Sequence, residues 1–132
     1  MRHVFVLACL ILLLLCTACS GSSPGTTSGD TLPAGDATRG AALFTQAING
    51  APSCSTCHTL DGSVLVGPSL KGFAAVAPTR VEGMSAADYA RASILQPASS
   101  IVSGFANLMY GQYAQQLTPQ QTADLVAYLL TL

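Results

Sequence analysis

The chain has 132 residues, of which half are hydrophobic and only 8% are charged, and its formal net charge is −1 at pH 7. This length favours one domain with appended segments. Because there are only five Lys and Arg residues and no basic cluster, the composition argues against nucleic acid or an anionic lipid surface as the partner.

The first 18 residues have the pattern of a secretory signal peptide. A short basic start precedes an apolar run over residues 4–15, which is too short to cross a bilayer, since a spanning helix needs about 20 residues. The run ends in Cys16-Thr17-Ala18-Cys19, which resembles the processing site of bacterial lipoproteins. That resemblance implies cleavage after Ala18 and lipid attachment at Cys19. The alternative is an ordinary signal peptide that leaves Cys19 as a free thiol.

Residues 19–35 are rich in Gly, Ser, Thr and Pro and contain almost nothing to bury. This composition is typical of a flexible linker, which here would join the lipid anchor to a domain. The domain is then expected over residues 36–132. In the chain from residue 19 onward, four basic residues stand against six acidic ones, so no strong electrostatic steering is expected.

Three segments of the domain carry helix start signals. The expected helices run from residue 37 to about 47, from 86 to about 95, and from 119 towards the end of the chain. Their caps are Asp36, Ser85 and Thr118, the last followed by Pro119 and by Gln121. No segment alternates as a strand. The pattern therefore predicts an all-α fold of short helices joined by long loops, which need something to wrap around.

The central motif is Cys54-Ser55-Thr56-Cys57-His58, the C-x-x-C-H signature of covalent c-type haem attachment. The two thiols can each add to a haem vinyl group, and the two residues between them set their separation. The adjacent His58 is then placed under the iron as an axial ligand. We therefore expect one covalently attached haem c.

Two other functions use similar residues. Structural zinc needs four Cys or His ligands, and a second pair at suitable spacing is absent from the sequence. A thiol–disulfide oxidoreductase usually carries its Cys-x-x-Cys where a strand leads into a helix of a βαβ unit, and no such pattern surrounds Cys54. Both alternatives are weaker than haem attachment.

With these motifs, the chain over residues 35–132 resembles class I, monohaem cytochromes c of the bacterial lipoprotein type. The segment from Gly35 to Phe44 is similar to the family's first helix, whose Gly40 and Phe44 would pack against Leu125 and Tyr128 of the last helix. The resemblance implies the cytochrome c fold, with short helices and long loops wrapped around one covalently bound haem.

The run Gly67-Pro68-Ser69-Leu70 matches the family's G-P-x-L element. By this resemblance the carbonyl of Pro68 accepts a hydrogen bond from Nδ1 of His58, which leaves Nε2 for the iron. On its own, Gly67-Pro68 could also be a simple turn.

The second axial ligand must come from elsewhere. His58 is the only histidine left after signal removal, so methionine is the natural candidate, and Met84 and Met109 remain. Met84 directly precedes the Ser85 cap, where an apolar residue often packs onto the helix. Met109 lies in a segment that resembles the family's ligand loop, with Tyr110 in place of the usual Pro. We expect Met109 as the ligand, with Met84 or an open site as the alternatives.

These expectations combine into a functional hypothesis. The protein would be a one-electron carrier of a respiratory or photosynthetic chain rather than an enzyme, with a haem-based ligand sensor or weak peroxidase as the alternative. Its partners would be a redox donor and acceptor, such as membrane complexes, that dock by apolar contact. It would be a monomer, exported to the periplasm or the outer face of the cell membrane and held there by lipid at Cys19. The haem-free chain is expected to lack a stable fold.

Overall fold

The computed structural model describes residues 32–132. The expected signal peptide, Cys19 and most of the linker therefore lie outside the described residues. Residues 32–132 contain five α-helices: α2 (Ala37–Phe44), α3 (Phe73–Val76), α4 (Ala86–Leu95), α5 (Tyr113–Gln116) and α6 (Pro119–Leu129). Three 3₁₀ turns, at Cys54–Thr56, Ala77–Thr79 and Pro97–Ser99, complete the set.

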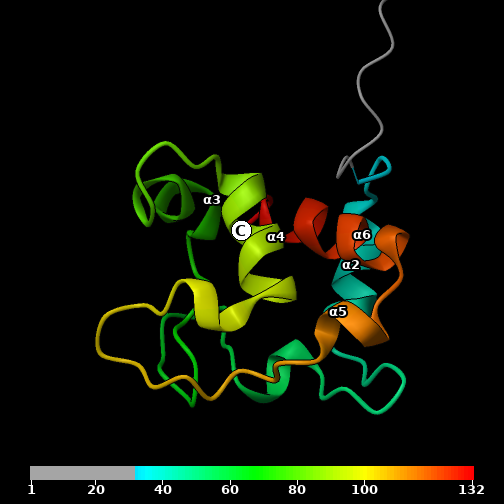
Figure 1. Ribbon diagram of the computed structural model, residues 1–132, viewed down its shortest axis with the longest axis horizontal. Coiled ribbons are helices and arrows are strands. Elements are labelled where there is room, and N and C mark those ends of the chain that lie inside the picture. The colour runs from blue at the N-terminus through cyan, green and yellow to red at the C-terminus, as the bar shows by residue number, and fades with distance from the viewer. Residues whose placement is uncertain (1–31) are drawn as a thin grey trace, which may run out of the picture. The chain divides into compact units, whose positions relative to one another are not determined.

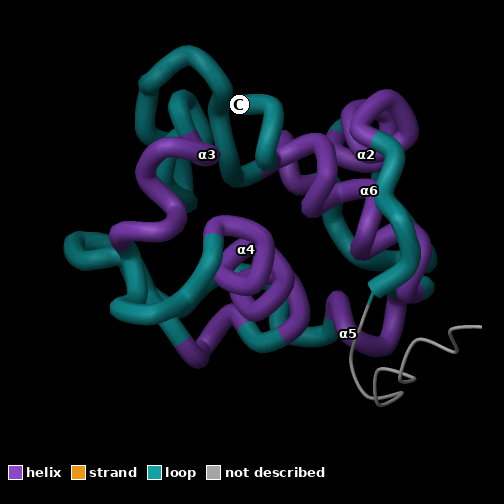
Figure 2. Tube along the Cα trace, turned by 90° about the horizontal axis from the view of Figure 1, so that it is seen from above, coloured by secondary structure: helices purple, strands orange, loops and turns teal. Residues whose placement is uncertain are grey.

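Within the described residues there is no strand, only one isolated bridge between Ile48 and Ala51. Loops, teal in Figure 2, connect the helices over long stretches. The predicted all-α fold of short helices and long loops is confirmed. No helix of residues 32–132 has the length and apolar character needed to cross a membrane.

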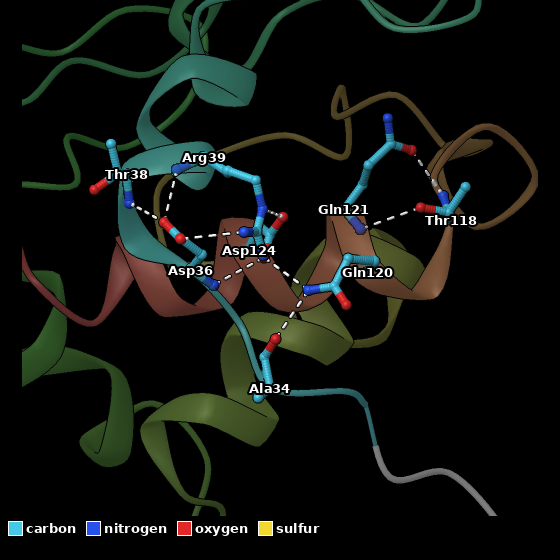
Figure 3. A network of polar contacts seen from close by, with 8 residues as sticks. All are labelled: Ala34, Asp36, Thr38, Arg39, Thr118, Gln120, Gln121 and Asp124. Atoms are coloured by element: carbon cyan, nitrogen blue, oxygen red, sulfur yellow. Dashed lines mark hydrogen bonds and ion pairs between the residues drawn. The ribbon is translucent and has the colours of Figure 1, made fainter.

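The helix starts follow the local signals. The Asp36 side chain accepts hydrogen bonds from the backbone of Thr38 and Arg39, at 2.8 and 3.0 Å. Ser85 caps α4 by accepting from the backbone of Asp88 at 3.1 Å. Thr118 and Gln121 form a reciprocal capping box at the start of α6 (Figure 3). A cap is a contact between neighbours in sequence, so sequence alone can predict it.

The first helix is shorter than expected, because α2 ends at Phe44 rather than near residue 47. The chain reverses at Asn49 and Gly50, whose φ angles are 49° and 87°, and this turn pairs Ile48 with Ala51. An Asn-Gly pair favours such a tight turn, since both residues tolerate the left-handed backbone. The Asn49-Gly50 pair was therefore the sequence signal that α2 ends earlier than residue 47.

Helices α2 and α6 cross at very short range and lie side by side in Figures 1 and 2. A Cβ atom added at Gly40 would lie 2.0 Å from the carbonyl oxygen of Asp124 and 2.7 Å from Cβ of Tyr128. The Phe44 and Tyr128 rings meet with centroids 5.6 Å apart. The expected packing of Gly40 and Phe44 on the last helix is thus present. Gly35 lies equally close to α6, because a Cβ atom added there would lie 2.2 Å from the Ala123 carbonyl oxygen, and the sequence pattern did not indicate this.

The same crossing holds a buried carboxylate, Asp124, which is 2% exposed (Figure 3). It accepts two hydrogen bonds from the Arg39 guanidinium, at 2.8 and 2.9 Å. The backbone N–H of Asp36 and the side chain of Gln120 donate to it as well. The hydrogen bonds from Arg39 hold the pKa of Asp124 well below its usual range. These contacts fix α2 on α6, and Leu125 and Leu129 of α6 line a cavity.

Candidate cofactor site

The Cys54–His58 segment folds as a tight turn. Residues Cys54–Thr56 form a 3₁₀ turn, and the backbone N–H groups of Cys57 and His58 both donate to the carbonyl of Cys54, at 3.1 and 3.0 Å. The turn brings both thiols and the imidazole to one cavity. Neither Cys54 nor Cys57 is in a disulfide. The two thiols are thus presented together with a histidine, which is the arrangement that attachment of a haem requires.

The orientation of His58 is set by the following loop. Its Nδ1 lies 2.8 Å from the carbonyl oxygen of Pro68, and because a carbonyl can only accept, Nδ1 carries the proton. Nε2 is therefore left with its lone pair available to a metal. The hydrogen bond that the resemblance implied is present.

Gly67 is needed for this contact. A Cβ atom at this position would lie 2.5 Å from Cε1 of His58, so any side chain would displace the imidazole ring. The Gly67 backbone N–H also donates to the carbonyl of Cys57 at 2.9 Å, and Leu70 N–H donates to the Thr59 carbonyl at 2.8 Å. The G-P-x-L element thus runs back along the Cys-x-x-Cys-His turn and supports its histidine.

Two cavities open beside this turn. The outer one has a volume of about 300 Å³ and lies between the turn and the loop over residues 97–110. The inner one has a volume of about 70 Å³ and is walled by apolar side chains: Phe44, Leu70, Phe73, Ala90, Ile94, Leu125 and Leu129. Four residues line both cavities, namely Cys54, His58, Ser93 and Met109. A predominantly apolar space with a few polar groups is typical of a cofactor site.

The predicted site residues come together here. Cys54, Cys57, His58, Pro68 and Met109 all line the outer cavity. The two methionine candidates differ, because Met109 also lines the inner cavity while Met84 borders neither of the two. Cys19 lies outside the described residues.

The chemistry of the Cys54 thiol argues against a thiol–disulfide oxidoreductase. Burial raises the pKa of the Cys54 thiol to about 11, so it stays protonated at neutral pH. A thiol–disulfide oxidoreductase needs the opposite, a nucleophilic cysteine of lowered pKa. Among residues 32–132, no three His, Cys, Asp or Glu side chains are grouped as a metal site would require.

Two cavity residues are not among the predicted site residues. The Oγ of Ser93 is buried and, in the part of the chain described, has no hydrogen-bond partner, although Ser93 lines both cavities. Tyr113 is buried in the cavity wall, and its hydroxyl donates to the Pro52 carbonyl at 2.8 Å. Neither role has a local signal, because a serine within a helix and a tyrosine at the start of one are ordinary residues.

These observations test whether a haem fits. The apolar walls suit a porphyrin, the paired thiols and the oriented imidazole suit its vinyl groups and iron, and a buried Ser93 hydroxyl without a partner is unusual unless a further group enters the site. The residues present therefore fit the cofactor.

Comparison with known families decides the assignment, since the family profile for cytochrome c matches residues 37–132. The chain belongs to the cytochrome c family. Membership implies a haem-based electron carrier with covalently attached haem c, consistent with Cys54 and Cys57. Comparison with curated proteins gave no match.

Proposed function

We propose that this cytochrome c is a one-electron carrier of a respiratory or photosynthetic chain, with His58 and Met109 as the two axial ligands of one haem. The observation that carries the proposal is that Met109 lines both cavities together with a His58 whose Nε2 is free. The haem, when bound, supplies an iron that exchanges single electrons. The remaining chemistry follows from what the chain's own residues do.

Each of these residues has one task. Cys54 and Cys57 hold the cofactor covalently, and the Pro68 carbonyl keeps the His58 ring in one orientation. A thioether ligand from Met109 favours the ferrous state relative to a second imidazole and so raises the reduction potential. A haem held by both His58 and Met109 would leave the iron no position for a substrate, so the chemistry it supplies would be electron transfer.

The two methionines supply the test. Holoprotein is made with wild-type sequence, with Met109→Ala and with Met84→Ala, and visible spectra of ferric and ferrous forms are recorded. Wild type and Met84→Ala should be low-spin, with the weak red band of Met–Fe(III) ligation, and should bind carbon monoxide poorly. Met109→Ala should lose the band, bind carbon monoxide and have a lower potential.

Three results would change the proposal. If Met84→Ala lost the band and Met109→Ala kept it, the ligand assignment would be wrong. A high-spin wild-type spectrum with fast carbon monoxide binding would favour a ligand sensor or a weak peroxidase instead. A purified protein without haem would remove the electron-carrier function altogether.

We also propose that the protein is exported and held on the periplasmic side or the outer face of the cell membrane by lipid at Cys19. The proposal rests on the signal pattern over residues 1–18 and the linker-like composition of residues 19–35. Cys19→Ser should move the haem protein from the membrane fraction to the soluble one. Continued membrane association of this variant would contradict lipid attachment at Cys19.

The proposed partners are a redox donor and acceptor, such as membrane complexes, that dock on a monomer by apolar contact. Large apolar side chains are exposed close to the cavity mouth. Val66, Ile101 and Leu108 line the outer cavity and are 53%, 47% and 67% exposed, and Val64 and Leu65 precede Val66 in the same loop. Such a surface excludes water on contact without needing a charged counterpart.

A further inference from the structure

Tyr113 joins two parts of the cavity wall that are far apart in sequence. It is the first residue of α5 and is 7% exposed. Its ring packs edge-on against Tyr110, with centroids 5.2 Å apart and planes at 76°. Its hydroxyl donates to the carbonyl of Pro52 at 2.8 Å, across 61 positions of sequence. Burial raises the pKa of Tyr113, so this hydroxyl remains a donor.

The hydrogen bond between Tyr113 and Pro52 lies close in sequence to the proposed haem ligands on both sides. Tyr113 follows Met109 by four residues, and Pro52 precedes Cys54 by two. The bond therefore connects the loop that carries Met109 with the turn that carries Cys54 and His58. A second contact lies between the same two parts of the chain, where the Asn49 side chain donates to the carbonyl of Gln116 at 2.9 Å.

The Met109 loop has little other support from its own backbone. Within the described residues, its backbone hydrogen bonds close short turns, from Phe105 to Val102 and from Leu108 to Ala106. Such local bonds shape the loop without fixing its distance from His58. A partly buried hydrogen bond to the opposite wall does fix that distance, because a donor or acceptor left unpaired there is costly.

We propose that the Tyr113 hydroxyl is a positioning group that keeps the Met109 loop at the correct distance from the His58 turn. The inference rests on the proposed ligation by Met109. Without the hydroxyl, the two walls can separate, and the bond between the Met109 sulfur and the iron opens more often. An external ligand then competes more successfully for the iron, while the haem itself stays attached through Cys54 and Cys57.

Tyr110, three residues before Tyr113, provides a matched control. The Tyr110 hydroxyl donates to Oε1 of Gln112 at 3.2 Å, an exposed contact within the same loop. Tyr113→Phe and Tyr110→Phe each remove one oxygen and keep the ring. Only Tyr113→Phe removes a contact between the two walls.

The experiment uses ferric holoprotein of the wild type and both variants, titrated with imidazole and followed by the red Met–Fe(III) band. Loss of one hydrogen bond of about 1 kcal/mol corresponds to roughly fivefold in an equilibrium constant. Tyr113→Phe should therefore bind imidazole about fivefold more tightly than wild type, and Tyr110→Phe should stay within about twofold. Urea unfolding of the same samples measures any general loss of stability separately.

Equal imidazole affinity in wild type and Tyr113→Phe would overturn the inference, even if the variant unfolds more easily. Met109→Ala serves as the reference for the proposed ligation, and because it should lack the red band, its imidazole binding is followed by the main haem absorption band instead. If it binds imidazole no better than wild type, the ligand assignment has failed rather than the positioning role.

Should Tyr113→Phe yield no folded holoprotein, Asn49→Gly decides, because glycine tolerates the positive φ at this position. Asn49→Gly removes the second contact between the two walls, the hydrogen bond to the Gln116 carbonyl. Imidazole binding at least twofold tighter in this variant supports the positioning role of these contacts, and unchanged binding contradicts it.

Discussion

Replacing Gly40 with alanine tests the close crossing of α2 and α6, on which the cavity depends. The added Cβ would lie 2.0 Å from the carbonyl oxygen of Asp124 and 2.6 Å from its carbonyl carbon, whereas ordinary contact begins at 3.4 Å. The two helices must therefore separate by roughly 1.4 Å at this point. The obstacle is backbone, which cannot rotate away as a flexible side chain can.

The expected loss of stability follows from two opposing effects. Overpacking a well-packed interface costs about 1–3 kcal/mol, and a backbone obstacle places Gly40→Ala at the upper end of that range. Alanine recovers about 0.8–1 kcal/mol over glycine through its helix propensity. The free energy of unfolding should thus fall by about 2 kcal/mol. With a urea dependence of about 1–3 kcal/mol per molar, the unfolding midpoint should fall by roughly 1 M.

The assay is urea unfolding of holoprotein, followed by far-UV circular dichroism and by the red Met–Fe(III) band. Gly111→Ala is the matched control, because no atom lies within 4 Å of its added Cβ and its φ is outside the left-handed region. It should change the unfolding free energy only slightly, by about 0.4–1 kcal/mol towards greater stability. A midpoint for Gly40→Ala equal to or above that of wild type would refute the reasoning from the helix crossing.

Three further expectations follow. Asp124→Asn should lower the unfolding free energy at pH 7 by about 1–2 kcal/mol rather than the 3–5 of a fully buried pair, since the Arg39 side chain is 56% exposed. The folded pKa of Asp124 lies below its unfolded value of about 3.9, so its contribution to the unfolding free energy is complete above that pH and is lost as the pH falls through the folded pKa. The urea midpoints of wild type and Asp124→Asn should therefore converge below about pH 4. A constant difference between them would contradict this. Chain made without haem, as Cys54→Ala/Cys57→Ala, should lose most of its helical circular dichroism because the cavity walls are left unsupported, and full helix content would count against that view. Electron transfer to a redox partner should depend only weakly on added salt, whereas a steep loss of rate would indicate charge-steered docking.

The features that the residues alone predicted correctly are local ones. The packing of Gly40 and Phe44 on α6, by contrast, was implied by the family resemblance. Asp36, Ser85 and Thr118 cap the helices as expected, because each cap contacts backbone two or three residues away. The turn around Cys54 and His58 follows from a spacing that covalent chemistry requires. The exception is the end of α2, where helical periodicity was extended too far although Asn49-Gly50 already marked a reversal.

The amino-acid sequence was therefore sufficient to predict the helical class, the helix starts and the residues that can hold a haem. Tertiary packing set the contacts between distant positions, such as Arg39 with Asp124 and Tyr113 with Pro52. It also placed the expected Met109, rather than Met84, beside the His58 cavity. The physical reason is that such pairs depend on how helices and loops pack in three dimensions. A local pattern records which residues a helix can begin with, but carries no information about which distant backbone will lie within hydrogen-bond reach.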